Sequence, residues 1–142
     1  MKKVLLIFLF LASVFANQSN VEKRIYETIL NALFPAKQTI CIWVDEPSKV
    51  ELFKSINGVK VVSNSSKADI LMLFKGEDIH KIDDSKKIFA NGYLVFQRVK
   101  GEAIGGFYWQ KGRPNLVFIN KKLKESGVSL PKKLKKYIEN ID

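Results

Sequence analysis

The sequence predicts an α/β fold: a single domain with helices packed on a mixed sheet, a βαβ-type first half and a β-hairpin-rich second half. Three observations predict it. In the first half, apolar β-branched runs alternate with amphipathic segments of helical period, and in the second half glycines separate short apolar runs. No internal repeat or long linker divides the chain, and 142 residues with 46% hydrophobic content can bury one core.

Residues 1–16 have the pattern of an export signal. Lys2 and Lys3 precede an apolar run, and Ala16 is followed by polar residues. The run is shorter than the roughly 20 residues of a membrane-spanning helix, and no basic cluster follows it. We therefore expect a signal peptide over residues 1–16, a periplasmic domain over residues 17–142, and no stable membrane span after cleavage; an uncleaved anchor is the alternative.

The domain is predicted to begin with a helix. Ser19 and Glu22 have the spacing of a capping box, and Pro35 ends the helical pattern. Residues 39–44 are β-branched and apolar, which is typical of a strand covered on both faces. The buried stripe of the helix comprises Val21, Ile25, Ile29 and Leu33.

A second helix is predicted after this strand. Asp45 or Glu46 can cap it, Pro47 suits its first turn, and Gly58 ends it. Strand, helix and strand in this order indicate a βαβ-type arrangement. The next segments are expected to be a strand at 59–62, a polar loop at 63–67 and a strand at 70–74.

The second half is predicted to contain more strands. Residues 110–114 indicate a hairpin turn, with Pro114 in the turn and not in the ladder. Gly105 and Gly106 mark a bulge or a close approach of another backbone or a ligand. The strands are expected at 87–90, 93–99, 103–109 and 115–119.

Two short helices are predicted near the C-terminus. Asn120 is expected to cap a helix over residues 121–126 that Gly127 ends. A last helix starts at about Pro131, with Leu130, Leu134 and Ile138 facing the core.

Groups suited to catalysis are few. Cys41 is the single cysteine, so no intramolecular disulfide can form, and its place in an apolar strand indicates a packed thiol. His80 is the single histidine, and we interpret it as a surface or capping residue. The glycines match no phosphate-binding loop. We expect no catalytic residues, no metal and no cofactor, and hence not an enzyme.

The chain is basic, with 24 lysines and arginines against 14 acidic residues. The C-terminal lysines lie on the polar sides of the predicted helices, where a solvated face is the simplest interpretation, and an acidic protein or anionic lipid is the alternative. Export and the scarcity of arginine disfavour nucleic acid. These lysines are Lys121, Lys122, Lys124, Lys132, Lys133, Lys135 and Lys136.

Aromatic residues precede the predicted hairpin turn. Strand alternation puts Phe107 and Trp109 on one side and Tyr108 on the other. Core packing explains such rings, but Trp, Tyr and Arg also dominate the energetics of protein interfaces. We therefore predict a partner-binding surface of Phe107, Tyr108, Trp109, Lys111 and Arg113.

The order of segments resembles the YfiR-like periplasmic proteins over nearly all of the predicted domain. The segments that carry the resemblance are 40–44, 68–74, 92–96 and especially 116–134, where a strand into Ile119-Asn120 is followed by a short helix, a glycine and a final helix. The resemblance implies a small regulatory domain that binds an inner-membrane signalling enzyme, typically a diguanylate cyclase, and holds it inactive until released. Cys41 alone excludes a switch by intramolecular disulfides, and whether the chain forms the family's homodimer stays open.

Two functions follow as expectations. The first is a non-enzymatic periplasmic regulator of cyclic-di-GMP signalling that binds an inner-membrane partner. The alternative is a small-ligand, or solute-binding, domain. Its ligand would lie at the carboxyl ends of the strands, near Asp45, Glu46 and residues 63–66.

Overall fold

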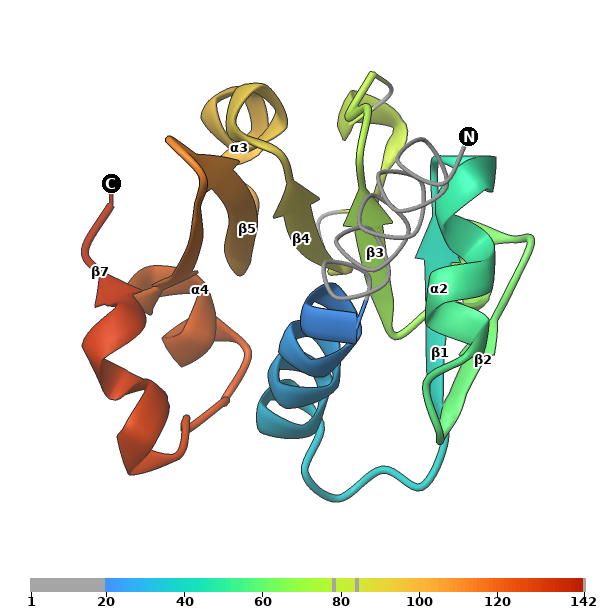
Figure 1. Ribbon diagram of the computed structural model, residues 1–142, viewed down its shortest axis with the longest axis horizontal. Helices are drawn as coiled ribbons and strands as arrows, with labels where there is room; N and C mark the ends of the chain where they lie inside the picture. Colours follow the sequence, from blue (N-terminus) through green and yellow to red (C-terminus); the bar gives the residue numbers. More distant parts are fainter. Residues whose placement is uncertain (1–19, 78, 84, 142) are drawn as a thin grey trace, which may run out of the picture.

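The computed structural model describes residues 20–77, 79–83 and 85–141, which form a seven-stranded sheet with helices on both faces (Figure 1). The predicted signal peptide and Ser19 of the capping box lie outside the described residues. The predicted α/β class with a mixed sheet is confirmed. The strands are β1 (Ile40–Val44), β2 (Val59–Val61), β3 (Ile70–Leu73), β4 (Lys87–Asn91), β5 (Gly105–Gln110), β6 (Arg113–Ile119) and β7 (Ile138–Glu139).

The strand order is β2-β1-β3-β4-β5-β6-β7. The first five strands are parallel neighbours, β6 is antiparallel to β5, and β7 is parallel to β6. The chain therefore runs outward from β1 to β2, and then returns across β1 to continue on the other side with β3. This reversal between β1 and β3 is the topological switch point of a doubly wound sheet.

The helices divide into two layers. In Figure 1 the helix over residues 20–33 and α2 lie in front of the strands. Residues of both helices belong to one core cluster, and α4 and the C-terminal 3-10 helix pack into this same cluster. A second cluster on the opposite face contains α3. The remaining elements are α2 (Val50–Lys54), α3 (Tyr93–Val99), α4 (Asn120–Glu125) and the 3-10 helices η1 (Pro47–Lys49), η2 (Ser65–Lys67), η3 (Ile79–Lys81) and η4 (Lys132–Tyr137).

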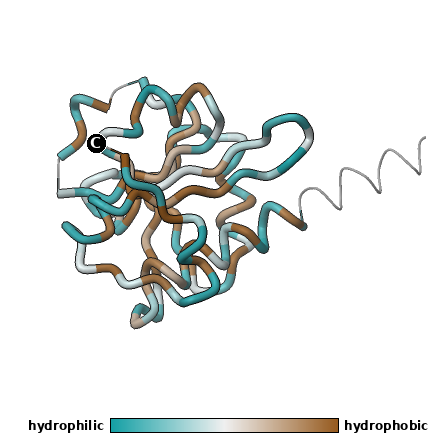
Figure 2. The backbone as a smooth tube through the Cα atoms, turned by 90° about the vertical axis from the view of Figure 1, so that its left-hand side faces the viewer, coloured by the Kyte–Doolittle hydropathy of each residue, from teal (hydrophilic) through white to brown (hydrophobic). Residues whose placement is uncertain are grey.

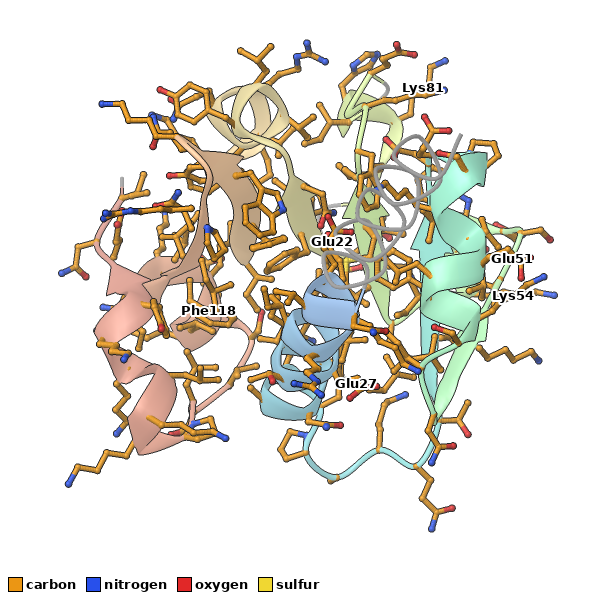
Figure 3. The ribbon with its side chains drawn as sticks, in the orientation of Figure 1. Glu22, Glu27, Glu51, Lys54, Lys81 and Phe118 are labelled. Atoms are coloured by element: carbon orange, nitrogen blue, oxygen red, sulfur yellow. The ribbon has the colours of Figure 1, made fainter. Side chains whose placement is uncertain are left out.

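The front core is mostly apolar, with one buried polar pair. Phe118, labelled in Figure 3, is fully buried there, and the hydropathy colours of Figure 2 place brown backbone inside and teal loops outside. The Tyr26 hydroxyl donates to Asn91 Oδ1 at 2.6 Å, which joins the first helix to the end of β4. Burial, with a smaller effect of the Glu22 charge, raises the pKa of Tyr26 far above its ordinary value. Tyr26 therefore stays a neutral donor.

The prediction of a strand at residues 93–99 is wrong, because this segment is the helix α3. Val95, Phe96 and Val99 are buried whereas Leu94 and Arg98 are exposed, which is a helical period. Since β4 and β5 are parallel, the chain between them must cross back over the sheet, and α3 makes this crossing.

Pro114 lies inside the ladder, opposite Trp109, and not in the turn as predicted. The closing pair of this two-residue hairpin, Gln110 and Arg113, exchanges hydrogen bonds, so the next pair does not. The N–H that proline lacks is therefore not needed between the strands. On its other side β6 pairs with β7 only at Phe118 and Ile119.

The C-terminal elements also differ from the prediction. Asn120 does not cap α4; its side-chain amide donates to Asn140 Oδ1 at 2.9 Å and so joins α4 to the segment after β7. The predicted last helix is the 3-10 helix η4, which buries Leu134 and stops because Ile138 pairs with β6. Glu46, by contrast, caps η1 as predicted by accepting from the Ser48 N–H.

Stability is expected to fall in acid partly through Asp69. Its carboxylate accepts hydrogen bonds from Lys37 Nζ at 2.7 Å and from the Cys41 N–H at 2.8 Å. Burial alone would raise the pKa of Asp69, but these two hydrogen bonds and the charges of Lys37 and Lys86 outweigh it and lower the pKa. The stabilisation is thus complete above about pH 4, the ordinary pKa, and is lost as the pH falls through the lowered value.

Urea denaturation between pH 6 and pH 2.5 measures this loss. The Asp69→Asn variant should be less stable at pH 6 and should lose less stability on acidification. A parallel decline in both proteins would contradict the assignment. Some decline in stability remains in the variant, because two other carboxylates also have lowered pKa values. The backbone N–H of Ser48 donates to Glu46, and that of Ser85 donates to Asp83, which helps to lower the pKa of each carboxylate.

Candidate functional site

The predicted partner-binding residues lie on the β5–β6 hairpin. Lys111 and Gly112 form its two-residue turn with φ values of +52° and +73°, the left-handed conformation that a type I′ turn requires. Such a turn matches the twist of the two strands. It holds Lys111 and Arg113 at the exposed tip of a regular ladder.

The aromatic residues of β5 alternate between the two faces, as predicted. Phe107 is buried in the front core, with its ring centroid 5.8 Å from that of Tyr26 and 6.0 Å from that of Trp109. Tyr108 lies on the other face, where it stacks on Phe96 at 5.7 Å. Phe107 is therefore part of the core, and Trp109 is the ring of this face that reaches the surface, with 36% exposure.

Two residues outside the predicted partner-binding set extend this surface. Tyr93, at the start of α3, is 43% exposed and makes an edge contact with Tyr108 at 5.4 Å. Its neighbour Leu94 is 76% exposed. The prediction of a strand at residues 93–99 gave no reason to expect Tyr93 and Leu94 at the surface, whereas the helix α3 exposes both. We call the end of the hairpin that carries Tyr93, Tyr108, Trp109, Lys111 and Arg113 the hairpin surface. It has two sides, because Tyr93 and Tyr108 lie on the α3 face and Trp109 lies on the front face.

A second candidate site is a crevice at the carboxyl ends of β1 and β3, which is the switch point of the sheet. Its volume is about 430 Å³. Lys81, labelled near the top of Figure 3, marks this end of the molecule. The lining comprises Trp43, Val44, Asp45, Pro47, Ser65, Leu73, Lys75, Gly76, Glu77, Ile79, Lys81 and Ile82.

Asp45 organises one wall of the crevice. Its carboxylate accepts from the backbone N–H groups of Phe74 at 2.6 Å, Lys75 at 3.0 Å and Gly76 at 2.9 Å. Three successive N–H groups that point at one spot form an anion-binding nest. The chain fills this nest with its own carboxylate, so the loop after β3 is fixed against the end of β1.

Further polar groups lie beside Asp45. Lys75 Nζ is 3.8 Å from Glu46 Oε2, and the Lys75 side chain is 47% exposed. The hydrogen bond from the Ser48 N–H, with help from Lys75, lowers the pKa of Glu46. Of the residues predicted near a ligand, Asp45 and Ser65 line the crevice. Glu46 does not line it but forms an ion pair with Lys75, which does. Trp43 and Lys75 were missed, because only the strand order brings them together.

The remaining candidates are spread over the fold. Cys41 is half-buried in β1, and His80 is exposed in η3. Within residues 20–77, 79–83 and 85–141, no group of three or more His, Cys, Asp or Glu side chains could hold a metal ion. The lysines of η4 are exposed, as expected of a solvated face. The same ranges contain no helix that is both long and apolar enough to cross a bilayer.

Comparison with known proteins identifies the fold. No protein-family model matches the chain, and no curated protein does either. A crystal structure of a conserved domain protein from Vibrio cholerae O1 biovar El Tor strain N16961 is similar, with a TM-score of 0.54 and 12% sequence identity. The match covers 84% of this chain and 60% of that one. At this identity the likeness supports the α/β fold alone.

Proposed function

We propose that this chain is a non-enzymatic periplasmic regulator that binds an inner-membrane signalling protein, a diguanylate cyclase, through the hairpin surface. The observation that supports the proposal is the presence of partly exposed aromatic rings on both faces of the β5–β6 hairpin, with two exposed cationic side chains at its tip. Tyr93 is 43% exposed on the α3 face and Trp109 is 36% exposed on the front face, and Lys111 and Arg113 are exposed at the tip of the hairpin. The partner class comes from the resemblance to YfiR-like proteins.

The rigidity of the hairpin favours such a role. Trp109 is held by its edge contact with Phe107, and Tyr108 by its stack on Phe96. Side chains that are already ordered lose little conformational entropy when a partner covers them. Regulation then needs different affinities for two states of the partner, because a ligand shifts an equilibrium only by that difference.

The test is recovery of the partner from solubilised inner membrane. Trp109→Ala and Arg113→Ala should each lower the recovery about tenfold or more, because truncation of a hot-spot tryptophan or arginine costs about 2 kcal/mol or more. Lys132→Ala, an exposed cation on η4, is the matched control and should recover the partner as the unmodified chain does. Equal recovery by all four proteins would refute the hairpin surface, provided that their circular dichroism spectra agree.

The crevice supports a second candidate, a small-ligand binding domain. Ligands of doubly wound sheets bind outside the carboxyl ends of the strands at the switch point, which is where this crevice lies. Its volume of about 430 Å³ falls within the range of small-molecule sites. Binding there is compatible with regulation, because a ligand could serve as the signal for release.

A further inference from the structure

We propose that the α3 side of the hairpin surface, extended by Leu94 and Arg98, rests on an anionic lipid bilayer, an inference that goes beyond the proposed function. The apolar part of this side is the outer stripe of α3. Leu94 is 76% exposed and Tyr93 is 43% exposed, although the other apolar residues of the helix are buried. Tyr93 also contacts Tyr108 of β5 at 5.4 Å, so the helix and the hairpin present one continuous surface.

Cations lie beside these apolar side chains. Arg98 follows Leu94 by one helical turn and is likewise exposed. Its guanidinium donates to a backbone carbonyl oxygen at 2.8 Å, a neutral acceptor that does not cancel its charge. Arg113 pairs with Gln110 in the ladder, which places it on the same face as Tyr108. The surface therefore combines apolar side chains with two exposed guanidinium groups.

Acidic residues are scarce in this part of the chain. Between residues 85 and 124 the sequence has nine lysines and arginines and one acidic residue, Glu102. Glu102 lines a separate hollow that no residue of α3 or of the hairpin lines. Glu77 lines the crevice, where two lysines accompany it. The α3 side thus has the charge that attracts anionic lipid headgroups.

The first helix places the start of the domain at the same end of the sheet. Its Tyr26 is hydrogen-bonded to Asn91 at the end of β4, and α3 begins two residues after Asn91. In Figure 1 this helix runs downward from its start, and α3 lies at the top. The apolar run of residues 4–15 precedes the helix in the sequence. Whether this run is a transient export signal or an uncleaved anchor, it brings this end of the domain to the bilayer.

A bilayer suits this side better than a second protein contact does. Leucine is under-represented among the energetically dominant residues of protein interfaces. Leucine and tyrosine flanked by cations are instead typical of surfaces that lie in the lipid headgroup region. So few side chains give weak, reversible binding, which orients the domain. The front side with Trp109 then stays open to an inner-membrane partner.

The experiment measures which part of the full chain contacts lipid. Cys41→Ala removes the native thiol, and a polarity-sensitive fluorophore is attached at Leu94→Cys or, as the matched exposed position, at Lys132→Cys. Vesicles contain equal parts of phosphatidylcholine and phosphatidylglycerol and carry nitroxide-labelled lipid as quencher. The label at position 94 should be quenched more strongly and emit further to the blue than the label at position 132. Any membrane binding by residues 4–15 is common to both chains, so it does not produce this difference.

Charge variants show whether the protein surface or the attached label drives the contact. In the chain labelled at position 94, Arg98→Gln and Arg113→Gln should each lower the ratio of docked to undocked protein about fivefold, the usual effect of one cation near an anionic bilayer. Lys132→Gln removes the same charge from η4 and should leave the ratio unchanged. Circular dichroism spectra confirm that the variants are folded.

Four outcomes would overturn the proposal. They are equal quenching at positions 94 and 132, equal quenching in vesicles of phosphatidylcholine alone, quenching that neither arginine variant lowers, and a spectral shift at position 94 that appears without vesicles as the protein concentration rises. The last would show that a second copy of the chain covers this side. Recovery of the partner in detergent is measured without a bilayer, so failure of the lipid contact and failure of the proposed function are distinguishable.

Discussion

Replacing Gly105 with alanine is expected to lower the free energy of unfolding by about 3 kcal/mol, the upper end of the usual cost of overpacking a core. Gly105 begins β5, between β4 and β6. A Cβ atom there would lie 2.6 Å from the Val117 carbonyl oxygen and 3.1 Å from the Phe89 ring. The oxygen belongs to the backbone of the neighbouring strand, so relief requires the ladder itself to move.

Gly101→Ala is the matched control for this change. A Cβ at Gly101 would meet nothing within 4 Å, and its φ is not in the left-handed region. Alanine there should leave stability unchanged or raise it by about 0.5 kcal/mol, because it restricts the unfolded chain. Urea denaturation measures both variants, and similar midpoints for the two would contradict the close approach at Gly105.

Asn91→Leu is expected to cost about 3 kcal/mol, since hydrogen bonds are lost and a buried donor is left without a partner. Asn91 is 5% exposed. Its Oδ1 accepts from the Tyr26 hydroxyl, and its Nδ2 donates to the carbonyl oxygens of Leu73 and Phe89, both at 3.2 Å. Leucine fills a similar volume but can accept nothing from Tyr26.

A double-mutant cycle tests the origin of this cost. Tyr26→Phe alone should cost about 1 to 2 kcal/mol, because Asn91 Oδ1 then lacks its donor. Combined with Asn91→Leu, however, it should restore part of the lost stability, since it removes the stranded hydroxyl. Strictly additive free energies of unfolding would show that the Tyr26–Asn91 hydrogen bond contributes no coupling.

Local pattern was enough to predict most of the parallel half of the fold. Residues 40–44 are apolar on both faces because Ile40 and Ile42 pack into the front core and Trp43 packs against the rear cluster, and the predicted strand differs from β1 by one residue. The hairpin was predicted for a similar reason. A glycine-containing turn between two apolar runs is a local signal that tertiary structure did not override.

The errors occurred where two local patterns were compatible with the same residues. Residues 93–99 are rich in aromatic and β-branched side chains, which favours a strand, yet their burial follows a helical period. Only the parallel pairing of β4 with β5 decides between them. Pro114 and Asn120 were misassigned for a similar reason. The place of Pro114 depends on which pairs of the β5–β6 ladder exchange hydrogen bonds, and the role of Asn120 depends on its distant partner Asn140.

The two candidate sites were predictable to different degrees. The hairpin lies within one local segment, so its turn within residues 110–114 could be predicted from the sequence alone, whereas the partner-binding role of Trp109, Lys111 and Arg113 stays a prediction. The crevice gathers residues from the ends of two strands and from η2 and η3, and Asp45 and Ser65 were found by the general rule for switch points. Lys75 carries no sequence signal that distinguishes it from the other lysines.

The Tyr26–Asn91 hydrogen bond joins groups 65 residues apart in the chain, a separation with a kinetic consequence. Closing a flexible loop of that length costs on the order of 4 kcal/mol of chain entropy. The strands between these residues reduce the cost once they have paired, because a loop of ordered segments is no longer flexible. Docking of the first helix should therefore follow assembly of β1, β3 and β4, and hydrogen exchange in residues 20–33 should report the last stage of refolding.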